Sequence, residues 1–402
     1  MQLSSLKIIV NSSGLFEEDG IANMQYWKLT AIILSFLFAI PAFGQTGTPE
    51  EAMALEKQGK LEEAVKVWRT VIQQNPRHAA AYASLGVILS KLQKFDEAAI
   101  AYKKALALNP NLPPGIQLNL GLAEFKQGHF KSAIAPFSIV LAADPQNQQA
   151  RILLGFCFYG AMQYAEAVKY LEPSSKLDPA NMELHKVLAQ SCLWAKNRAC
   201  AENEFRLILK QDPNSAAAHI FLGQALDQVG RTSEALSEFQ EAAQIAPHEP
   251  NLHFGLGFLH LKLNQYEDAK KELGIELSLD PTNAQALAYL GDIALKQSHP
   301  EEAVSLLKKS IQLKSDLRFA HLCLGNALTK LKRYQEAAIA LQRAIALDPS
   351  EPDAHYQLGR VYRALGDTAA SQKEFDKVRG LRQKVDEDLI HKMSSAPPAI
   401  NP

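Results

Sequence analysis

The sequence lacks the motifs of the common enzyme classes. It has no Gly-x-Ser-x-Gly, no His-Glu-x-x-His and no phosphate loop ending in Gly-Lys-Ser or Gly-Lys-Thr. Nucleophile elbows, zinc proteases and nucleotide-binding loops depend on those spacings. No Cys-x-x-Cys pair occurs among the four cysteines, so thiol redox chemistry and haem attachment have no support. We therefore expect no enzymatic activity, no metal and no cofactor.

An excess of charge of one sign is also missing. The chain has 42 Lys and Arg against 43 Asp and Glu, and its basic residues form no stripe. Proteins that bind nucleic acid obtain most of their non-specific affinity by neutralising phosphates. We therefore expect no nucleic-acid partner.

Long hydrophobic runs are absent apart from one near the start. Leu29–Ile40 is an almost wholly apolar run of twelve residues, preceded by Lys28 and followed by the small residues Ala42 and Gly44. This order predicts a signal peptide at residues 24–44, cleaved after Gly44. Twelve residues are short for a bilayer, but an inner-membrane anchor formed by residues 29–44 is the alternative.

The first 23 residues fit an export signal poorly, because Glu17, Glu18 and Asp19 form an acidic cluster. We expect translation to begin at Met24, so that residues 1–23 are a polar extension that is not translated. A start at Met1 stays open.

A 34-residue period organises the rest of the chain into ten units. When Ala98 is assigned position 20, alanine recurs at this position in nine consecutive units, with one 35-residue step before Ala133, and Ser371 follows in the tenth. Position 8 is glycine or alanine, and position 32 is proline in eight units. Small residues allow helices to cross closely and proline ends helices. Each unit is therefore predicted to be a pair of antiparallel helices, with position 8 facing position 20.

The repeat is clearest in unit two, which carries Tyr82, Leu85, Gly86, Leu89, Ala98, Tyr102 and Pro110. These residues and their spacing resemble the tetratricopeptide repeat family. The resemblance covers residues 45–383 and implies an all-α fold, a right-handed α-solenoid (superhelix) whose first helices line a groove for peptides or partner helices. We expect a C-terminal capping helix at residues 384–393 and a disordered tail at residues 394–402.

Positions 2, 5, 9 and 12 of each first helix form a stripe that packing does not require to be apolar. In units three, four and seven positions 5, 9 and 12 of this stripe are nevertheless aliphatic or aromatic, and in the last unit two arginines add a positive patch. Such a groove suits a peptide with spaced hydrophobic residues; burial between successive first helices is the alternative. The predicted partner-binding residues are Leu118, Leu122, Phe125, Ile152, Phe156, Tyr159, Phe254, Phe258, Leu261, Tyr356, Arg360 and Arg363.

Two further features of the family, a carboxylate clamp and a flat ring at position 4, bear on what this chain could bind. The resemblance implies that a carboxylate clamp needs Lys at position 5 and Asn at position 9 of one unit, and no unit has both; chaperone-tail binding is therefore disfavoured. Position 4 takes a flat ring in this family, and successive units pack roughly 8–10 Å apart, too far to share metal ligands. We therefore expect packing, and no metal site, for the five histidines at position 4, which are His185, His219, His253, His321 and His355.

Unit five, in which Ala189 replaces glycine, is expected to be the least regular. Cys192 lies near the end of its first helix and Cys200 at the start of its second, so the hairpin brings them close. A disulfide is one interpretation, suited to an oxidising compartment, and two buried thiols are the other.

Together these features predict an exported, non-enzymatic scaffold that binds a protein or peptide in its groove, in the bacterial periplasm or at the cell surface. The alternative is a structural accessory subunit of a bacterial envelope complex, for polysaccharide export, secretion or outer-membrane assembly, that uses its outer face.

Overall fold

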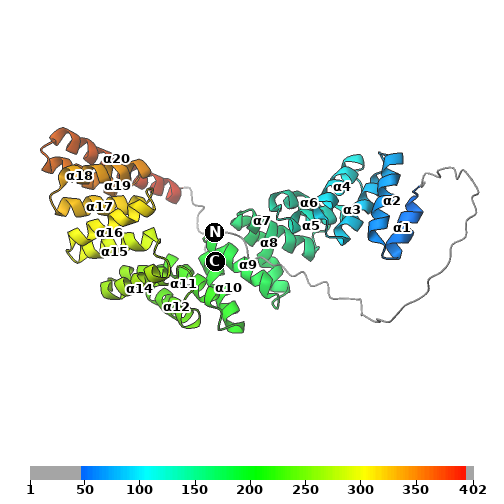
Figure 1. Ribbon diagram of the computed structural model, residues 1–402, viewed down its shortest axis with the longest axis horizontal. Helices are drawn as coiled ribbons and strands as arrows, with labels where there is room; N and C mark the ends of the chain where they lie inside the picture. The colour runs from blue at the N-terminus through cyan, green and yellow to red at the C-terminus, as the bar shows by residue number, and fades with distance from the viewer. Residues whose placement is uncertain (1–46, 395–402) are drawn as a thin grey trace, which may run out of the picture. The chain divides into compact units, whose positions relative to one another are not determined.

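The computed structural model describes the backbone of residues 47–394, and side chains for residues 47–384 and 387. Every regular element in this part of the chain is an α-helix, and the helices follow one another in ten antiparallel pairs (Figure 1). The all-α solenoid predicted from the repeat is confirmed. The predicted signal peptide and the tail from residue 395 onward lie outside the described residues.

The first helices of the ten units are α1 (Pro49–Lys57), α3 (Ala79–Lys91), α5 (Pro114–Lys126), α7 (Gln148–Gly160), α9 (Met182–Trp194), α11 (Ala216–Gln228), α13 (Leu252–Lys262), α15 (Ala284–Lys296), α17 (Arg318–Lys330) and α19 (Pro352–Ala364). The second helices are α2 (Leu61–Gln74), α4 (Phe95–Leu108), α6 (Phe130–Ala143), α8 (Tyr164–Leu177), α10 (Arg198–Gln211), α12 (Thr232–Ile245), α14 (Tyr266–Leu279), α16 (Pro300–Leu313), α18 (Tyr334–Leu347) and α20 (Thr368–Ser394).

Second helices end where the proline column predicts. In units one to nine the last helical residue stands two positions before position 32. In eight of these units position 32 is proline, which has no N–H and disfavours helix in the residue before it; unit eight ends at the same place with Ser315. In unit ten position 32 is Gln383, and α20 runs on to Ser394. The predicted capping segment at residues 384–393 is thus the continuation of this second helix rather than a separate element.

A left-handed residue closes the turn between the two helices of every unit. Its φ lies between 58° at Gln93 and 83° at Gly366, and only four of these ten residues are glycines. In unit two, Gln93 N–H donates to the Ser90 carbonyl and Lys94 N–H to the Leu89 carbonyl. This Schellman-type closure satisfies the last carbonyls of the first helix and sets the second helix antiparallel to it.

The small residues at position 20 are fully buried in units one to nine, as the repeat predicts. Position 8 faces position 20 in units six and seven, where a Cβ on Gly223 or Gly257 would lie 3.1 Å or 3.2 Å from the carbonyl oxygen of Ala235 or Ala269. The nearest atoms, however, belong to a larger side chain. A Cβ on Gly325 would lie 2.5 Å from Leu341 Cγ, and one on Gly121 would lie 2.7 Å from Phe137 Cε1. Leu341 and Phe137 occupy position 24, so the glycine makes room for a large core side chain one turn beyond the alanine.

The two layers of helices pack differently along the stack. Every helix contacts the next helix in sequence, and first helices also contact the first helix of the next unit, as in α13 with α15 and α15 with α17. Within the described residues, second helices make no comparable contacts with each other. The first helices therefore form the inner layer, and neighbouring second helices stand further apart.

Among units two to nine the irregular one is unit seven rather than unit five; α1 of unit one is also short, with 9 residues. Helices α9 and α10 have the usual 13 and 14 residues, whereas α13 has 11 and follows Asn251 in a left-handed conformation. The buried Glu276 carboxylate compensates, accepting hydrogen bonds from Phe254 N–H at 3.1 Å and Asn283 Nδ2 at 3.0 Å.

Candidate functional site

The predicted groove residues of units three and four lie deeper than an open binding surface requires. Leu118 and Leu122 on α5 are half-buried, but Phe125 is buried and packs edge-on against Phe130, with ring centroids 5.6 Å apart. On α7 Ile152 is half-buried. The core therefore already uses Phe125, while the three aliphatic side chains keep part of their surface in solvent.

The two aromatic groove residues of α7 have different environments. Phe156 is only 9% exposed, so it belongs to the core. Tyr159 is half-buried, and its hydroxyl donates a hydrogen bond to Gln190 Oε1 on α9. Burial, and then the neighbouring Tyr164, raises the pKa of Tyr159, so the hydroxyl stays a neutral donor. Tyr159 joins two successive units along the inner layer.

Unit seven begins a line of aromatic side chains that crosses three units. Phe254 and Phe258 on α13 lie with ring centroids 5.7 Å and 5.5 Å from Tyr289 on α15. Tyr289 in turn lies 4.9 Å from Phe319 on α17. All four rings are half-buried, as is the predicted residue Leu261. Tyr289 and Phe319, at positions 6 and 2, were not predicted as groove residues, because neither stood out from one sequence column.

The predicted residues of unit ten are the exposed ones. Tyr356 on α19 is 44% exposed, and Arg360 and Arg363 are also exposed. The Arg363 guanidinium lies 4.9 Å from the centroid of the Phe375 ring, and Arg360 donates to Gln357 Oε1 at 3.3 Å. Within the described residues neither arginine pairs with a carboxylate, so both charges are available to an acidic partner.

The two cysteines of unit five are joined. Cys192 and Cys200 form a disulfide across the turn between α9 and α10, with their Cα atoms 5.7 Å apart. Cys157 and Cys323 are buried free thiols. Burial raises the pKa of Cys157 to about 12, which keeps this thiol protonated and unreactive.

The histidines at position 4 make a contact that the sequence analysis missed. In units five, six, seven and ten, Nδ1 lies 2.5–2.7 Å from a glutamate carboxylate at position 23 of the same unit. In units six, seven and ten, Nε2 also faces a backbone carbonyl at position 32 of the preceding unit. The recurring His and Glu columns, 19 residues apart, are the signal that could have revealed it. The pairs are His185 with Glu204, His219 with Glu238, His253 with Glu272, and His355 with Glu374.

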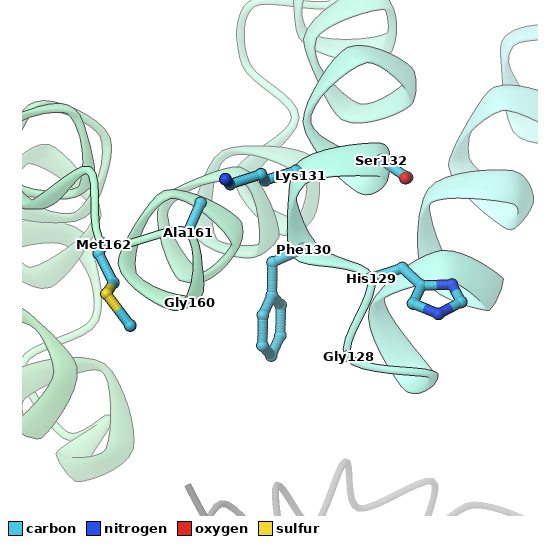
Figure 2. Close-up of a pocket in the computed structure, with 8 residues that line it drawn as sticks. All are labelled: Gly128, His129, Phe130, Lys131, Ser132, Gly160, Ala161 and Met162. Carbon is cyan, nitrogen blue, oxygen red and sulfur yellow. The ribbon is translucent and has the colours of Figure 1, made fainter. Parts of the chain in front are cut away.

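A shallow hollow of about 410 Å³ lies between the turns of units three and four. Figure 2 shows Phe130 projecting at this hollow and the Lys131 side chain extending toward Ala161. A Cβ on Gly160 would lie 2.3 Å from Phe130 Cδ2, so the ring packs directly on the backbone of the neighbouring unit. The hollow joins two units and holds no group of catalytic residues.

Among the side chains of residues 47–384, no three His, Cys, Asp or Glu residues gather as metal ligands would. None of the helices there combines the length and the apolar character needed to span a bilayer.

Family models match most of the repeat region. Models described as tetratricopeptide repeat match residues 50–113, 197–250, 228–274 and 352–384, and one described as TPR repeat matches residues 325–366. A model described as anaphase-promoting complex, cyclosome, subunit 3 matches residues 126–206 and 273–344.

Curated relatives match short parts of the chain. Protein CTR9 homolog of Arabidopsis thaliana is 29% identical over 98 residues, which is 24% of this chain and 9% of that protein. Protein O-mannosyl-transferase TMTC1 of Mus musculus is 28% identical over 142 residues, 35% of this chain and 15% of that protein. The chain thus spans less than a sixth of the length of these two relatives.

Among solved structures, the crystal structure of the APC/C hetero-tetramer Cut9-Hcn1 aligns with 82% of this chain and 79% of its own, at 17% identity and a TM-score of 0.49. The tandem helix pairs, the buried small residues at their crossings and the family matches agree. The chain is a tetratricopeptide repeat protein, a helical scaffold suited to protein–protein interaction.

Proposed function

We propose that this chain is a non-enzymatic scaffold that holds a peptide or protein segment against its inner layer of first helices. The observation that carries the proposal is the aromatic line of Phe254, Phe258, Tyr289 and Phe319, which spans α13, α15 and α17 with part of each ring in solvent. Aromatic side chains anchor interfaces because each buries a large area at a small entropic cost.

The exposed residues of unit ten, at the C-terminal end of the inner layer, favour a ligand that carries both acidic and apolar residues. Tyr356 offers a ring, and Arg360 and Arg363 offer two guanidinium groups that meet no carboxylate within the described residues. Guanidinium groups bind carboxylates in bidentate geometry. A bound segment with spaced hydrophobic residues and an acidic end would therefore place its hydrophobic residues on units seven to nine and its acidic end on unit ten.

A second candidate function is favoured by apolar side chains on the second helices. Ile100 on α4 is 69% exposed, and Leu177 at the end of α8 is 65% exposed. Exposed aliphatic residues on the outer layer suit a structural subunit of a bacterial envelope complex for polysaccharide export, secretion or outer-membrane assembly.

The two candidates are distinguished by substitutions on the two layers. Cells expressing the tagged chain are cross-linked, and bound proteins are identified by mass spectrometry for Phe258→Ser, Tyr356→Ser and the outer-layer control Ile100→Ser. We avoid Phe156, since its burial makes any polar substitution a stability change. Loss of partners with the inner-layer variants alone supports groove binding. Loss with Ile100→Ser alone supports the outer face and contradicts the proposal.

Export to the bacterial periplasm or cell surface is part of the same proposal and rests on residues 24–44 of the sequence. N-terminal sequencing of the purified protein is expected to begin at Gln45 or its cyclised form. A protein that begins at Met1 or Met24 contradicts cleavage and favours the membrane-anchored alternative.

A further inference from the structure

Unit nine has the histidine of the His–Glu column but lacks its glutamate. His321 occupies position 4 on α17 and is 8% exposed. Position 23, which is glutamate in the four paired units, is here Ala340. The His321 Nε2 atom lies 3.0 Å from the Ser315 carbonyl oxygen, a contact that units six, seven and ten also make. No hydrogen bond within the described residues involves Nδ1.

A pocket occupies the place of the missing carboxylate. Its volume is about 520 Å³, and it lies between α16 and α18 with α17 as its floor. Its apolar wall is formed by Ile311, Leu324, Leu328 and Ile339, and Ile339 is 68% exposed at the rim. Neighbouring second helices stand apart, and the small Ala340 side chain leaves that gap open above His321.

The charges around this pocket favour an anion. Lys308 on α16 and Arg343 on α18 line it, together with one acid, Glu336. Both carboxylate oxygens of Glu336 accept hydrogen bonds at 2.6 Å from the Arg333 guanidinium, so its charge is already compensated. Two cations therefore face the pocket beside a histidine whose Nδ1 has no partner among the described residues.

We propose that the unit-nine pocket binds an acidic segment of a partner protein, with a ligand carboxylate taking the place that a glutamate of this chain takes in four other units. The carboxylate accepts a hydrogen bond from His321 Nδ1, as Glu204, Glu238, Glu272 and Glu374 do from their histidines. Apolar residues beside the acid pack on Ile311 and Ile339.

The proton count of this contact sets its pH dependence. Because Nε2 donates to the Ser315 carbonyl, the neutral imidazole offers only a lone pair at Nδ1. Binding a carboxylate therefore requires the imidazolium, and the complex takes up one proton. The affinity should fall as the pH rises. Lys308, Glu336 and Arg343 are the other ionisable groups that face the pocket.

The pocket is separate from the groove of the proposed function. It opens between second helices, whereas Phe319, the nearest member of the aromatic line, contacts Tyr289 in the inner layer. Failure of one site therefore leaves the other intact. A partner could engage both layers of unit nine at once.

The test uses the full chain, immobilised, and a pool of short capped peptides with a central glutamate flanked by mixed Leu, Ile, Val and Phe. A matched pool has glutamine at the centre. Ala340→Glu is the decisive variant, because it rebuilds the His–Glu pair of the other units and fills the pocket from within. We expect the wild-type chain to retain the glutamate pool, and Ala340→Glu to reduce retention roughly tenfold to a hundredfold, since hydrogen bonds to charged groups have that effect on binding.

His321→Gln provides the second arm. Glutamine can still donate to the Ser315 carbonyl but forms no cation, so we expect weaker binding and no rise in affinity on acidification. Circular dichroism establishes that each variant is folded, and if Ala340→Glu fails to fold, His321→Gln decides.

Equal retention of the glutamate and glutamine pools by the wild-type chain overturns the proposal. So does undiminished binding by folded Ala340→Glu, or a pH profile that His321→Gln leaves unchanged. Phe258→Ser, which alters only the inner layer, should retain the pool as wild type does, so this pocket and the groove are tested independently.

Discussion

The close approach at position 8 predicts that one substitution has opposite effects at two glycines of the same protein. Gly325 lies inside α17, where a new Cβ would lie 2.5 Å from Leu341 Cγ and 2.6 Å from Leu341 Cδ2. Leu341 is fully buried. Gly274 lies inside α14, and a Cβ there would meet nothing within 4 Å.

The expected free energies follow from two terms. Alanine is favoured over glycine within a helix by about 1 kcal/mol, so Gly274→Ala should stabilise unit seven by roughly 0.5–1 kcal/mol. At Gly325 the same gain is opposed by overpacking, which costs about 1–3 kcal/mol in a close-packed core. Gly325→Ala should therefore destabilise unit nine by up to about 2 kcal/mol.

Native-state hydrogen exchange is the suitable assay, because a solenoid of ten units need not unfold in one step and exchange reports each helix separately. Protection of α17 and α18 should fall in Gly325→Ala, and protection of α14 should rise in Gly274→Ala. In a Leu341→Ala background, Gly325→Ala should instead be stabilising, since the opposing side chain is gone. If Gly325→Ala in the wild-type background raises protection as Gly274→Ala does, the interpretation that position 8 packs closely on position 24 is wrong.

Further predictions concern single contacts. Glu276→Gln should lower the stability of unit seven by about 1–3 kcal/mol, because a buried carboxylate that holds the start of α13 is lost; exchange of the α13 amides measures it. Met162→Gly should raise the stability of the α7–α8 hairpin by about 0.5–1 kcal/mol, because φ at this residue is 61° and glycine adopts that conformation without strain; urea unfolding should show a later midpoint. Burial alone would raise the pKa of Glu374, but the hydrogen bonds from His355 and Lys377 lower it below its ordinary value of 4.5. The depressed pKa stabilises the fold above about pH 4.5, and that stabilisation is lost as the pH falls through the folded pKa. Protection of α19 in wild type should therefore decline below about pH 4.5, with a smaller decline in Glu374→Gln.

The repeat period could be predicted from the sequence because it records backbone geometry that every unit shares. Alanine at position 20 is buried in nine units, and the proline column marks where second helices end. The prediction that position 8 faces position 20 was incomplete, because the glycine meets the position-20 carbonyl in units six and seven but lies nearest to the side chain at position 24. The large column at position 24 was not considered as the neighbour that the glycine accommodates.

The binding surface was harder to predict, because exposure depends on how deeply each unit packs on the next. Phe125 and Phe254 were assigned to the same stripe, yet Phe125 is buried and Phe254 is half-buried. Tyr289 escaped notice, although its ring joins α13 to α17. One repeat position in the sequence does not show which aromatic rings of neighbouring helices cover a side chain. That information comes from the packing of the helices in the structure.

Departures from the repeat are where recognition chemistry can arise in a protein of this architecture. A unit that carries both the histidine and the glutamate satisfies both ring nitrogens internally, as units six, seven and ten do. A unit that keeps the histidine and loses the glutamate exposes a half-completed contact at a fixed place, and the surrounding helices hold it rigid. Ala340 is inconspicuous as a residue, since alanine is common throughout these helices. It becomes informative only beside four glutamates at the same position, because the pocket above His321 then occupies the place of the carboxylate that the other units supply themselves.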